Sequence, residues 1–164
     1  MHYYIGIPNP RDDKENNEWW TRKLSAMGRS GVKIERRYLK RRELTIELGG
    51  IVKYKATIPK LQEKGIDLKL GLDLVRMTRE RSFDVAILFS QDGDLVEAID
   101  EVHRIAKEQK RVVLVECAFP HAAGVDRYPI NKATPVRIEK ALYDACIDPI
   151  DYRQSLPFTS SPTP

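Results

Sequence analysis

Two acidic residues one position apart, Asp92 and Asp94, follow directly after an apolar run. The run covers residues 85–89, and the polar segment Ser90-Gln91-Asp92-Gly93-Asp94 ends it. Two carboxylates this close repel each other unless water or a divalent cation lies between them, and Mg²⁺ and Mn²⁺ prefer such oxygen ligands. The alternative is that the pair only caps the next helix, because Asp is favoured at an N-cap and in a first turn.

A strand–helix–strand unit must position this acidic pair. The run at 85–89 is typical of a strand that is buried on both faces, as in a parallel sheet. Apolar residues then recur at helical spacing from Leu95 to Ala106, and a second apolar run follows at 112–115. This order predicts a βαβ unit. The acidic pair would then lie at the carboxyl end of a buried strand, where open α/β sheets bind ligands.

The segment 66–75 fits both a strand and a helix. Its apolar residues alternate strictly, which is a strand pattern, yet Leu70 and Leu74 also belong to a helical stripe. Leucine forms helices better than strands, so we predict a helix. Asp67 then lies in the first turn, where a carboxylate is favoured. Asp73 lies about 120° around the helix from Asp67, so the two cannot easily share one metal ion.

These residues resemble the NYN domain, a family of PIN-like nucleases. The likeness rests on Lys64-Gly65-Ile66-Asp67, on Asp73, and on the strand that ends in Ser90-Gln91-Asp92-Gly93-Asp94-Leu95. The family usually has Ser-Gly-Asp-(Gly or Ser)-Asp-Phe in the last motif, so Gln91 and Leu95 depart from it. The likeness spans roughly residues 1 to 117, and its two motifs occur in the family's order and at its separation.

The resemblance implies a PIN-like α/β fold, with a mostly parallel sheet flanked by helices. It implies a ribonuclease that depends on Mg²⁺ or Mn²⁺ and cleaves RNA phosphodiester bonds with metal-activated water. The catalytic and metal-binding acids would be Asp67, Asp92 and Asp94. Supporting roles are expected for Ser90, as a hydrogen-bond partner of a metal ligand or a water, for Lys64, as a phosphate contact, and for Asp73.

A function without catalysis is the main alternative. The same fold would then serve as an inactive module that binds RNA or a protein partner. A strand-end Asp-x-Asp also occurs in glycosyltransferases and phosphatases, but the former usually need a larger domain. In the latter the nucleophile follows its strand directly, without a spacer such as Ser90-Gln91.

One element of the family pattern is not visible in this chain. The family opens with an apolar strand that ends in an acidic residue, and this strand is central in its sheet. We expect such a strand upstream of Met1, where it would supply a fourth acid. Two alternatives stay open: a partner chain or a second copy in a homo-oligomer completes the sheet, or the remaining strands close the gap.

A basic cluster precedes a predicted hairpin. Alternating residues on both sides of Gly49-Gly50 predict a β-hairpin arm around 43–57. The cluster at the base of this arm contains no acid and consists of Arg36, Arg37, Lys40, Arg41 and Arg42. It either protects a sheet edge or contacts RNA phosphates through an attraction that weakens with salt. The acidic site favours RNA, because carboxylates alone would repel a polyanion.

The composition is that of an ordinary globular protein. The 164 residues are 41% hydrophobic and 32% charged, with a net charge of +4. We expect one domain over 1–150 and a disordered Ser/Thr/Pro-rich tail over 151–164. No apolar stretch approaches the roughly 20 residues that cross a membrane. Two isolated cysteines, Cys117 and Cys146, and the lack of a secretory signal favour a cytoplasmic protein without membrane contact.

Three further segments carry periodic signals. A strand is predicted at 3–7, and a helix with Trp20, Leu24 and Met27 as its buried stripe follows it. The neighbouring Trp19 must point in another direction, where it either packs in the core or stacks a base. Near the C-terminus, Thr134-Pro135 predicts the start of a helix with an apolar stripe at i, i+4 and i+8.

Overall fold

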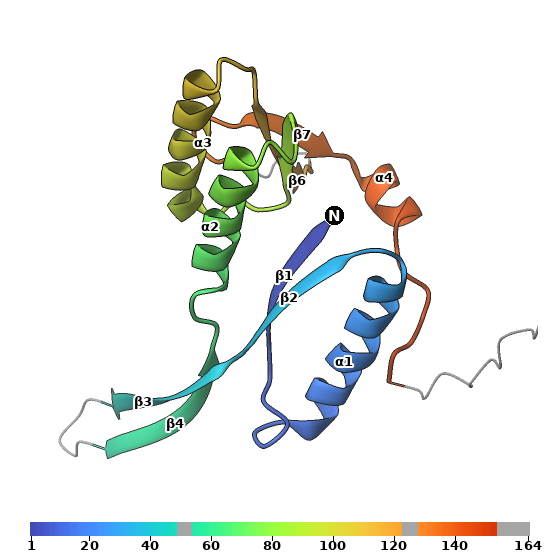
Figure 1. Cartoon of the computed structure of the whole chain (residues 1–164). Helices are drawn as coiled ribbons and strands as arrows, with labels where there is room; N and C mark the ends of the chain where they lie inside the picture. The colour runs from blue at the N-terminus through green and yellow to red at the C-terminus, as the bar shows by residue number, and fades with distance from the viewer. Residues whose placement is uncertain (49–53, 123–127, 154–164) are drawn as a thin grey trace, which may run out of the picture. The chain divides into compact units, whose positions relative to one another are not determined.

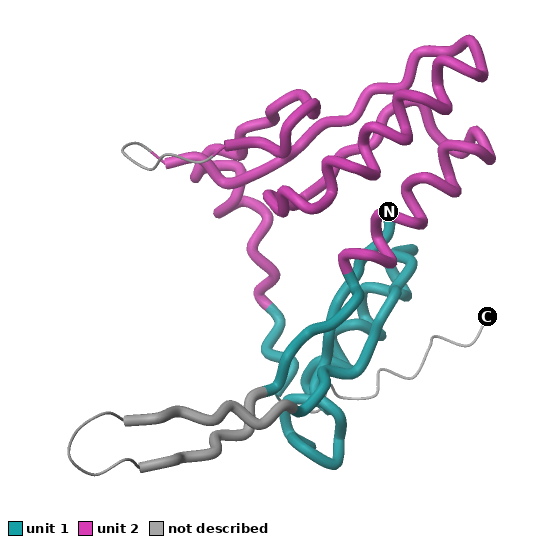
Figure 2. The backbone as a smooth tube through the Cα atoms, turned by 90° about the vertical axis from the view of Figure 1, so that its left-hand side faces the viewer, with its two compact units in different colours: residues 1–66, 150–164 teal, residues 67–149 magenta. Residues whose placement is uncertain are grey.

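The chain forms two compact units. The computed structural model describes residues 1–48, 54–122 and 128–153, with the backbone alone at 42–48 and 54–60. Unit 1 comprises residues 1–66 and 150–164, and unit 2 comprises residues 67–149 (Figure 2). Both contain short parallel sheets flanked by helices, so the predicted α/β class is confirmed at this level. Most of the predicted tail, from residue 154 onward, lies outside the described residues.

Unit 1 is built on a βαβ unit (Figure 1). Its elements are β1 (His2–Ile7), α1 (Lys14–Arg29) and β2 (Lys33–Tyr38), and the two strands pair in parallel. Asp13 caps α1 by accepting a hydrogen bond from the Asn16 N–H at 3.1 Å. Leu24 packs in a small core with Ile5 and Ile7, against which Trp20 and Met27 lie. The predicted strand and the predicted helical stripe are therefore confirmed.

A long hairpin follows β2. It consists of β3 (Lys40–Leu48) and β4 (Tyr54–Gln62), which pair antiparallel with Leu48 opposite Tyr54. The predicted hairpin is therefore confirmed, and its strands extend beyond 43–57 at both ends. The connection at 49–53 lies outside the described residues.

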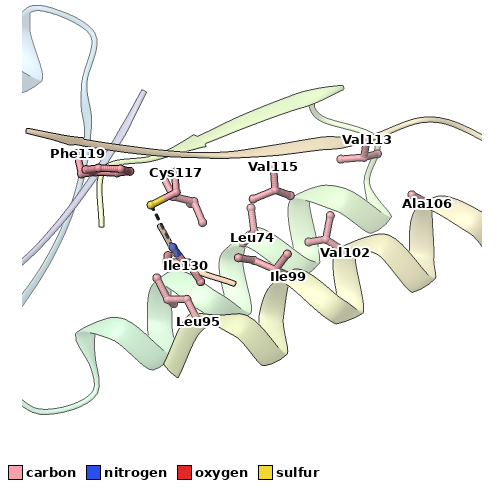
Figure 3. Close-up of a cluster of buried hydrophobic side chains, with 11 residues drawn as sticks. Leu74, Leu95, Ile99, Val102, Ala106, Val113, Val115, Cys117, Phe119 and Ile130 are labelled. Carbon is pink, nitrogen blue, oxygen red and sulfur yellow. Dashed lines mark hydrogen bonds between the residues drawn. The ribbon is translucent and has the colours of Figure 1, made fainter. Parts of the chain in front are cut away.

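Unit 2 contains the second βαβ unit. Its elements are α2 (Ile66–Arg79, whose first residue belongs to unit 1), β5 (Val85–Leu88), a 3₁₀ turn η1 (Gly93–Leu95), α3 (Val96–Glu108), β6 (Leu114–Pro120), β7 (Thr134–Ile138) and α4 (Lys140–Ala145). The three strands pair in parallel in the order β5-β6-β7. Figure 3 shows α2 and α3 beneath one face of this sheet, with Leu74, Ile99, Val102 and Val115 in the core between them. The helix predicted from 66 and the predicted βαβ unit are confirmed.

The helices α2 and α3 run in the same direction. Gly71 of α2 packs so closely on α3 that a Cβ atom at this position would lie 3.3 Å from the Cβ of Ala98. At the other end, the Gln109 side chain donates a hydrogen bond to the Arg79 carbonyl at 3.0 Å. Both helices therefore begin at the end of unit 2 at which β5 ends.

The strand β5 is not buried on both faces, so this part of the prediction is wrong. Ala86 and Leu88 point to the helices, whereas Val85 and Ile87 are 48% and 51% exposed. Leu114, opposite Val85 on β6, is also exposed. Among the described residues of unit 2, α2 and α3 cover one face of the sheet near β5, and the side chains of Val85, Ile87 and Leu114 make the other face apolar.

The predicted helix from residue 134 is wrong as well. Residues Thr134–Ile138 form β7, and α4 covers only Lys140–Ala145. The β-branched residues Thr134, Val136 and Ile138 alternate along β7, which is the pattern of a strand. No helix in the described ranges 1–48, 54–122 and 128–153 is long and apolar enough to cross a membrane.

Arg111 holds the loops of unit 2 that precede β5 and β6. Its side chain is 16% exposed and donates hydrogen bonds to the carbonyl oxygens of Thr78 and Phe83, at 3.1 and 2.7 Å. It also pairs with the Asp84 carboxylate at 2.8 Å. Arg111 therefore satisfies carbonyls where α2 ends, which a shorter or apolar side chain cannot do.

We expect Arg111→Met to lower the free energy of unfolding by about 2–4 kcal/mol, because several charge-assisted hydrogen bonds are lost together. Arg104→Met is the matched control, since the ion pairs of Arg104 among the described residues are exposed and join it to Glu101 and Glu108 on its own helix. Such surface pairs contribute about 0–1 kcal/mol. Urea denaturation measures both variants, and equal losses would contradict the role of Arg111.

Candidate active site at the carboxyl end of β5

The loop after β5 is held by hydrogen bonds to two other segments of the same chain. The fully buried Cys117 thiol donates to the Ser90 carbonyl at 2.9 Å, and Cys117 itself accepts from the Ile130 N–H at 3.5 Å (Figure 3). The Gln91 amide donates to the Tyr128 carbonyl at 3.1 Å. These contacts tie the loop to β6 and to the segment before β7. The backbone that carries Asp92 and Asp94 is therefore held in place.

Asp92 uses one carboxylate oxygen as a cap. Its Oδ1 accepts a hydrogen bond from the Asp94 N–H at 3.0 Å, and its own N–H donates to the Ser90 hydroxyl at 3.1 Å. The structure thus shows the capping role, with η1 as the capped turn. It does not decide against a ligand role, because a carboxylate has a second oxygen. Ser90 supports the main chain of Asp92, which refines its predicted supporting role.

Asp67 lies in the first turn of α2, as predicted, and its side chain is exposed. It precedes Gly71 by one helical turn, or roughly 6 Å along the axis. A Cβ atom at Gly71 would lie 3.8 Å from the side chain of Leu95, the residue after Asp94. Asp67 therefore belongs to the same end of unit 2 as Asp92 and Asp94. Asp94 is exposed as well.

The three acids do not converge as a ligand group. Across residues 1–48, 54–122 and 128–153, no cluster of three or more His, Cys, Asp or Glu side chains has a geometry that would hold a metal ion. The donor chemistry nevertheless fits Mg²⁺ or Mn²⁺, because all the acids offer hard carboxylate oxygens. Asp67 and Asp94 have exposed side chains that can change rotamer, whereas Asp92 is held by the turn that it caps.

Asp73 takes part in ion pairs within α2. It is only 4% exposed, and its carboxylate lies 2.7 Å from the Lys69 ammonium and 3.2 Å from the Arg76 guanidinium. Its place is more than a helical turn beyond Asp67. These contacts describe a structural role for Asp73, in keeping with its weaker position among the predicted acids.

The turn before α2 is anchored in unit 1 by Glu63, a residue that sequence reasoning missed. Its carboxylate accepts a hydrogen bond from the Gly6 N–H at 2.9 Å, and a Cβ atom at Gly6 would lie 2.6 Å from it. The pKa of Tyr3 is raised by burial and further by the negative charge of Glu63. No periodic pattern in the sequence marks a contact between residues so far apart, so this contact could not be predicted from the sequence.

Gly65 has a positive φ of 78°, which explains glycine at this turn. A Cβ atom there would lie 3.0 Å from the Arg37 guanidinium. Arg37 of the basic cluster therefore lies beside the turn that ends two residues before Asp67. Lys64, the predicted phosphate contact, is exposed in the same turn.

The basic cluster is exposed where its side chains are described. Arg36, Arg37, Lys40 and Arg41 are all exposed, and the side chain of Arg42 lies outside the described part. The only ion pair that the described residues give to the cluster joins Arg41 and Asp12 at 3.9 Å. Arg36 and Arg37 lie on β2, one of the two strands of a parallel pair. Both predicted roles, edge protection and phosphate contact, are consistent with this position.

Comparisons of the chain with protein families, with curated proteins and with solved structures found no match.

Proposed function

We propose that this protein is a ribonuclease of PIN-like type that requires Mg²⁺ or Mn²⁺. One observation carries the proposal: the βαβ unit of unit 2 places Asp92 and Asp94 at the carboxyl end of β5, and the parallel helix α2 brings Asp67 to the same end. Ligands bind at this edge in open α/β sheets. The resemblance of the two acidic motifs to the NYN family supplies the reaction class.

The residues of the chain have separate tasks in this proposal. Asp67, Asp92 and Asp94 would hold the cation with carboxylate oxygens, and the hydrogen bond from the Asp92 N–H to Ser90 fixes the backbone of the loop. A bound divalent cation supplies a Lewis acid that lowers the pKa of water and stabilises charge on a leaving oxygen. Lys64 and the basic cluster would neutralise RNA phosphates.

Cleavage of labelled single-stranded RNA in the presence of Mn²⁺ tests the proposal directly. We expect cleavage that a chelator abolishes and that added Mn²⁺ restores. A chain that binds RNA but never cleaves it, with either Mg²⁺ or Mn²⁺, would instead establish the inactive RNA-binding module. The absence of a convergent ligand group in the described residues is the observation that favours this second function.

The basic cluster should determine how RNA binding depends on salt. Replacing Arg36 and Arg37 by Gln removes two exposed cations on β2, so RNA affinity should fall and the salt slope should flatten. Each lost phosphate contact on a single strand reduces the slope of log K against log[salt] by about 0.7. Electrophoretic or fluorescence titrations at several salt concentrations measure this slope.

The double variant Lys107→Gln and Lys110→Gln is the matched control. Lys107 lies at the end of α3 and Lys110 just after it, and both are exposed. Their replacement removes the same amount of charge as the first variant but leaves β2 unchanged. Extending the first variant to Arg41 and Arg42 should flatten the slope further. If the slope changes neither in the double variant of Arg36 and Arg37 nor in its extension to Arg41 and Arg42, the cluster would only protect a sheet edge.

The sheet of unit 2 also points to a partner strand. β5 is the outer strand of its sheet, yet its sequence has no charge and no proline, the features that protect natural edges. Residues on both of its faces are apolar, which is the pattern of an interior strand. We include in the proposal an additional parallel strand at the edge of β5 that β6 does not pair, supplied from outside unit 2, for example by a partner chain or a second copy.

A further inference from the structure

We infer that a hollow on unit 1 binds a nucleobase, which stacks on the indole of Trp19. The hollow has a volume of about 520 Å³ and lies along the first half of α1, with Arg153 on its rim. The inference deepens the proposed function, because it names a place where RNA would be held. That RNA is the natural ligand of this hollow rests on the proposed function, whereas the binding of a base can be measured independently of it.

The two neighbouring tryptophans have different surroundings. Trp20 packs against the core of Ile5, Ile7 and Leu24, whereas Trp19 is not part of this core group. The rings meet edge to face, with their centroids 4.6 Å apart and their planes at 81°. The Lys23 ammonium lies 5.3 Å from the Trp19 ring centroid, so one face of this indole already holds a cation and a base would stack on the other face. Trp19 remains half-buried and lines the hollow.

One residue of the lining, Arg153, comes from the far end of the described chain. Arg22 donates a hydrogen bond from Nε to the Tyr152 carbonyl at 2.7 Å, and its Nη2 lies 3.5 Å from the Arg153 carbonyl. Tyr152 is buried, and the Lys23 ammonium lies 5.8 Å from its ring centroid. The hollow is thus a tertiary feature of unit 1 rather than a groove on one helix.

The chemistry of the lining fits a base better than other ligands. Glu15, Glu18, Arg22 and Arg153 surround the indoles, so the rim offers both acceptors and donors. A base has a π-face that stacks on an aromatic ring and an edge that carries amino and keto groups. A phosphate alone would face two carboxylates beside the two guanidiniums, and Arg22 already donates to the Tyr152 carbonyl and pairs with Glu18. An apolar ligand would leave the charged rim without water. Single-stranded RNA is recognised through such stacking.

Isothermal titration calorimetry with the four nucleoside 5′-monophosphates tests the site, with ribose 5-phosphate as the ligand that lacks a base. We expect nucleotides to bind and ribose 5-phosphate not to bind. Trp19→Leu should weaken nucleotide binding by about 5- to 150-fold, the range expected for one stacked base. Trp19→Tyr keeps an aromatic face and should retain most of the affinity.

Two arginine variants provide the matched comparison. Arg153→Ala removes a cation from the rim and should weaken binding, whereas Arg29→Ala removes an exposed cation near the end of the same helix and should not. Circular dichroism shows whether each variant keeps its fold. If Trp19→Leu fails to fold, the comparison of Trp19→Tyr, Arg153→Ala and Arg29→Ala decides the question.

Several results would overturn the base site. The first is an unchanged nucleotide affinity in a folded Trp19→Leu variant. The second is ribose 5-phosphate binding as tightly as the nucleotides, and the third is that no nucleotide binds. The outcomes separate from those of the nuclease assay. Nucleotide binding without RNA cleavage would support the base site and refute the ribonuclease proposal. Cleavage without nucleotide binding would support the ribonuclease proposal and refute the base site.

Discussion

Asp92→Asn is expected to abolish metal-dependent RNA cleavage while leaving the stability of the protein nearly unchanged. Asn is as good a cap as Asp, and its side-chain oxygen can still accept the Asp94 N–H. It lacks the negative charge that a divalent cation requires. Even outer residues of metal sites reduce activity or metal affinity about 10- to 100-fold when mutated, so losing a ligand should cost at least the upper value.

Two further variants separate the cap from the ligand. Asp92→Ala removes both functions, so it should lose activity and also destabilise the protein, by about 1 kcal/mol for the cap. Asp144→Asn makes the same chemical change on α4, where Asp144 pairs only with Lys140 in the described structure, and should be fully active. RNA cleavage with Mn²⁺ and thermal melting without metal measure the two effects.

Asp94→Asn and Asp67→Asn should lose activity to a similar extent, with stability unchanged, because both side chains are exposed. Full cleavage activity in a folded Asp92→Asn would refute the catalytic assignment. If the change to Asn instead lowers the melting temperature strongly, the hydrogen bond to the Asp94 N–H would need the charge itself. The acidic pair would then be explained by capping.

The parts predicted correctly are those in which local periodicity and tertiary packing agree. The stripe of α1, with Trp20, Leu24 and Met27, packs on the core of unit 1 as its spacing requires. In 66–75, strand and helix periods both fit, and the helix preference of leucine predicted the observed helix correctly. The order of apolar runs around Asp92 was enough to predict a parallel βαβ unit.

The errors arise where a local pattern does not determine the layer that surrounds it. Val85 and Ile87 are apolar whether or not a second layer covers them, so the sequence alone cannot show an open face. At 134–138 the helical spacing of later residues outweighed the alternation of Thr134, Val136 and Ile138. The contact between Glu63 and Gly6 depends on tertiary structure and leaves no periodic trace.

A strand fused to the chain so that it reaches the free edge of β5 should raise the melting temperature. The new strand would form about four hydrogen bonds, each worth about 1 kcal/mol net. It would also cover part of Val85 and Ile87, which are half-exposed. After the entropy of ordering the strand is subtracted, a gain of about 2 kcal/mol corresponds to a rise of about 4–8 °C for a protein of this size.

The chain without a fused strand provides the comparison. If a second copy supplies the strand, light scattering should show association, and the melting temperature should rise with protein concentration. Ile87→Lys places a charge on the exposed apolar face and should reduce both effects, whereas Leu142→Lys changes an exposed residue of α4 and should not. Slower hydrogen exchange of the β5 amides on association would show that the second copy pairs with the edge of β5.

These measurements also distinguish an interior strand from an ordinary edge. An interior strand that lacks a neighbour gains hydrogen bonds and buried apolar area from an added strand, so stability and RNA cleavage should increase together if the sheet supports the acidic site. An ordinary edge gains neither. A stable, cooperative monomer that cleaves RNA, does not respond to the fused strand and tolerates Ile87→Lys would show that β5 ends its sheet in the functional protein.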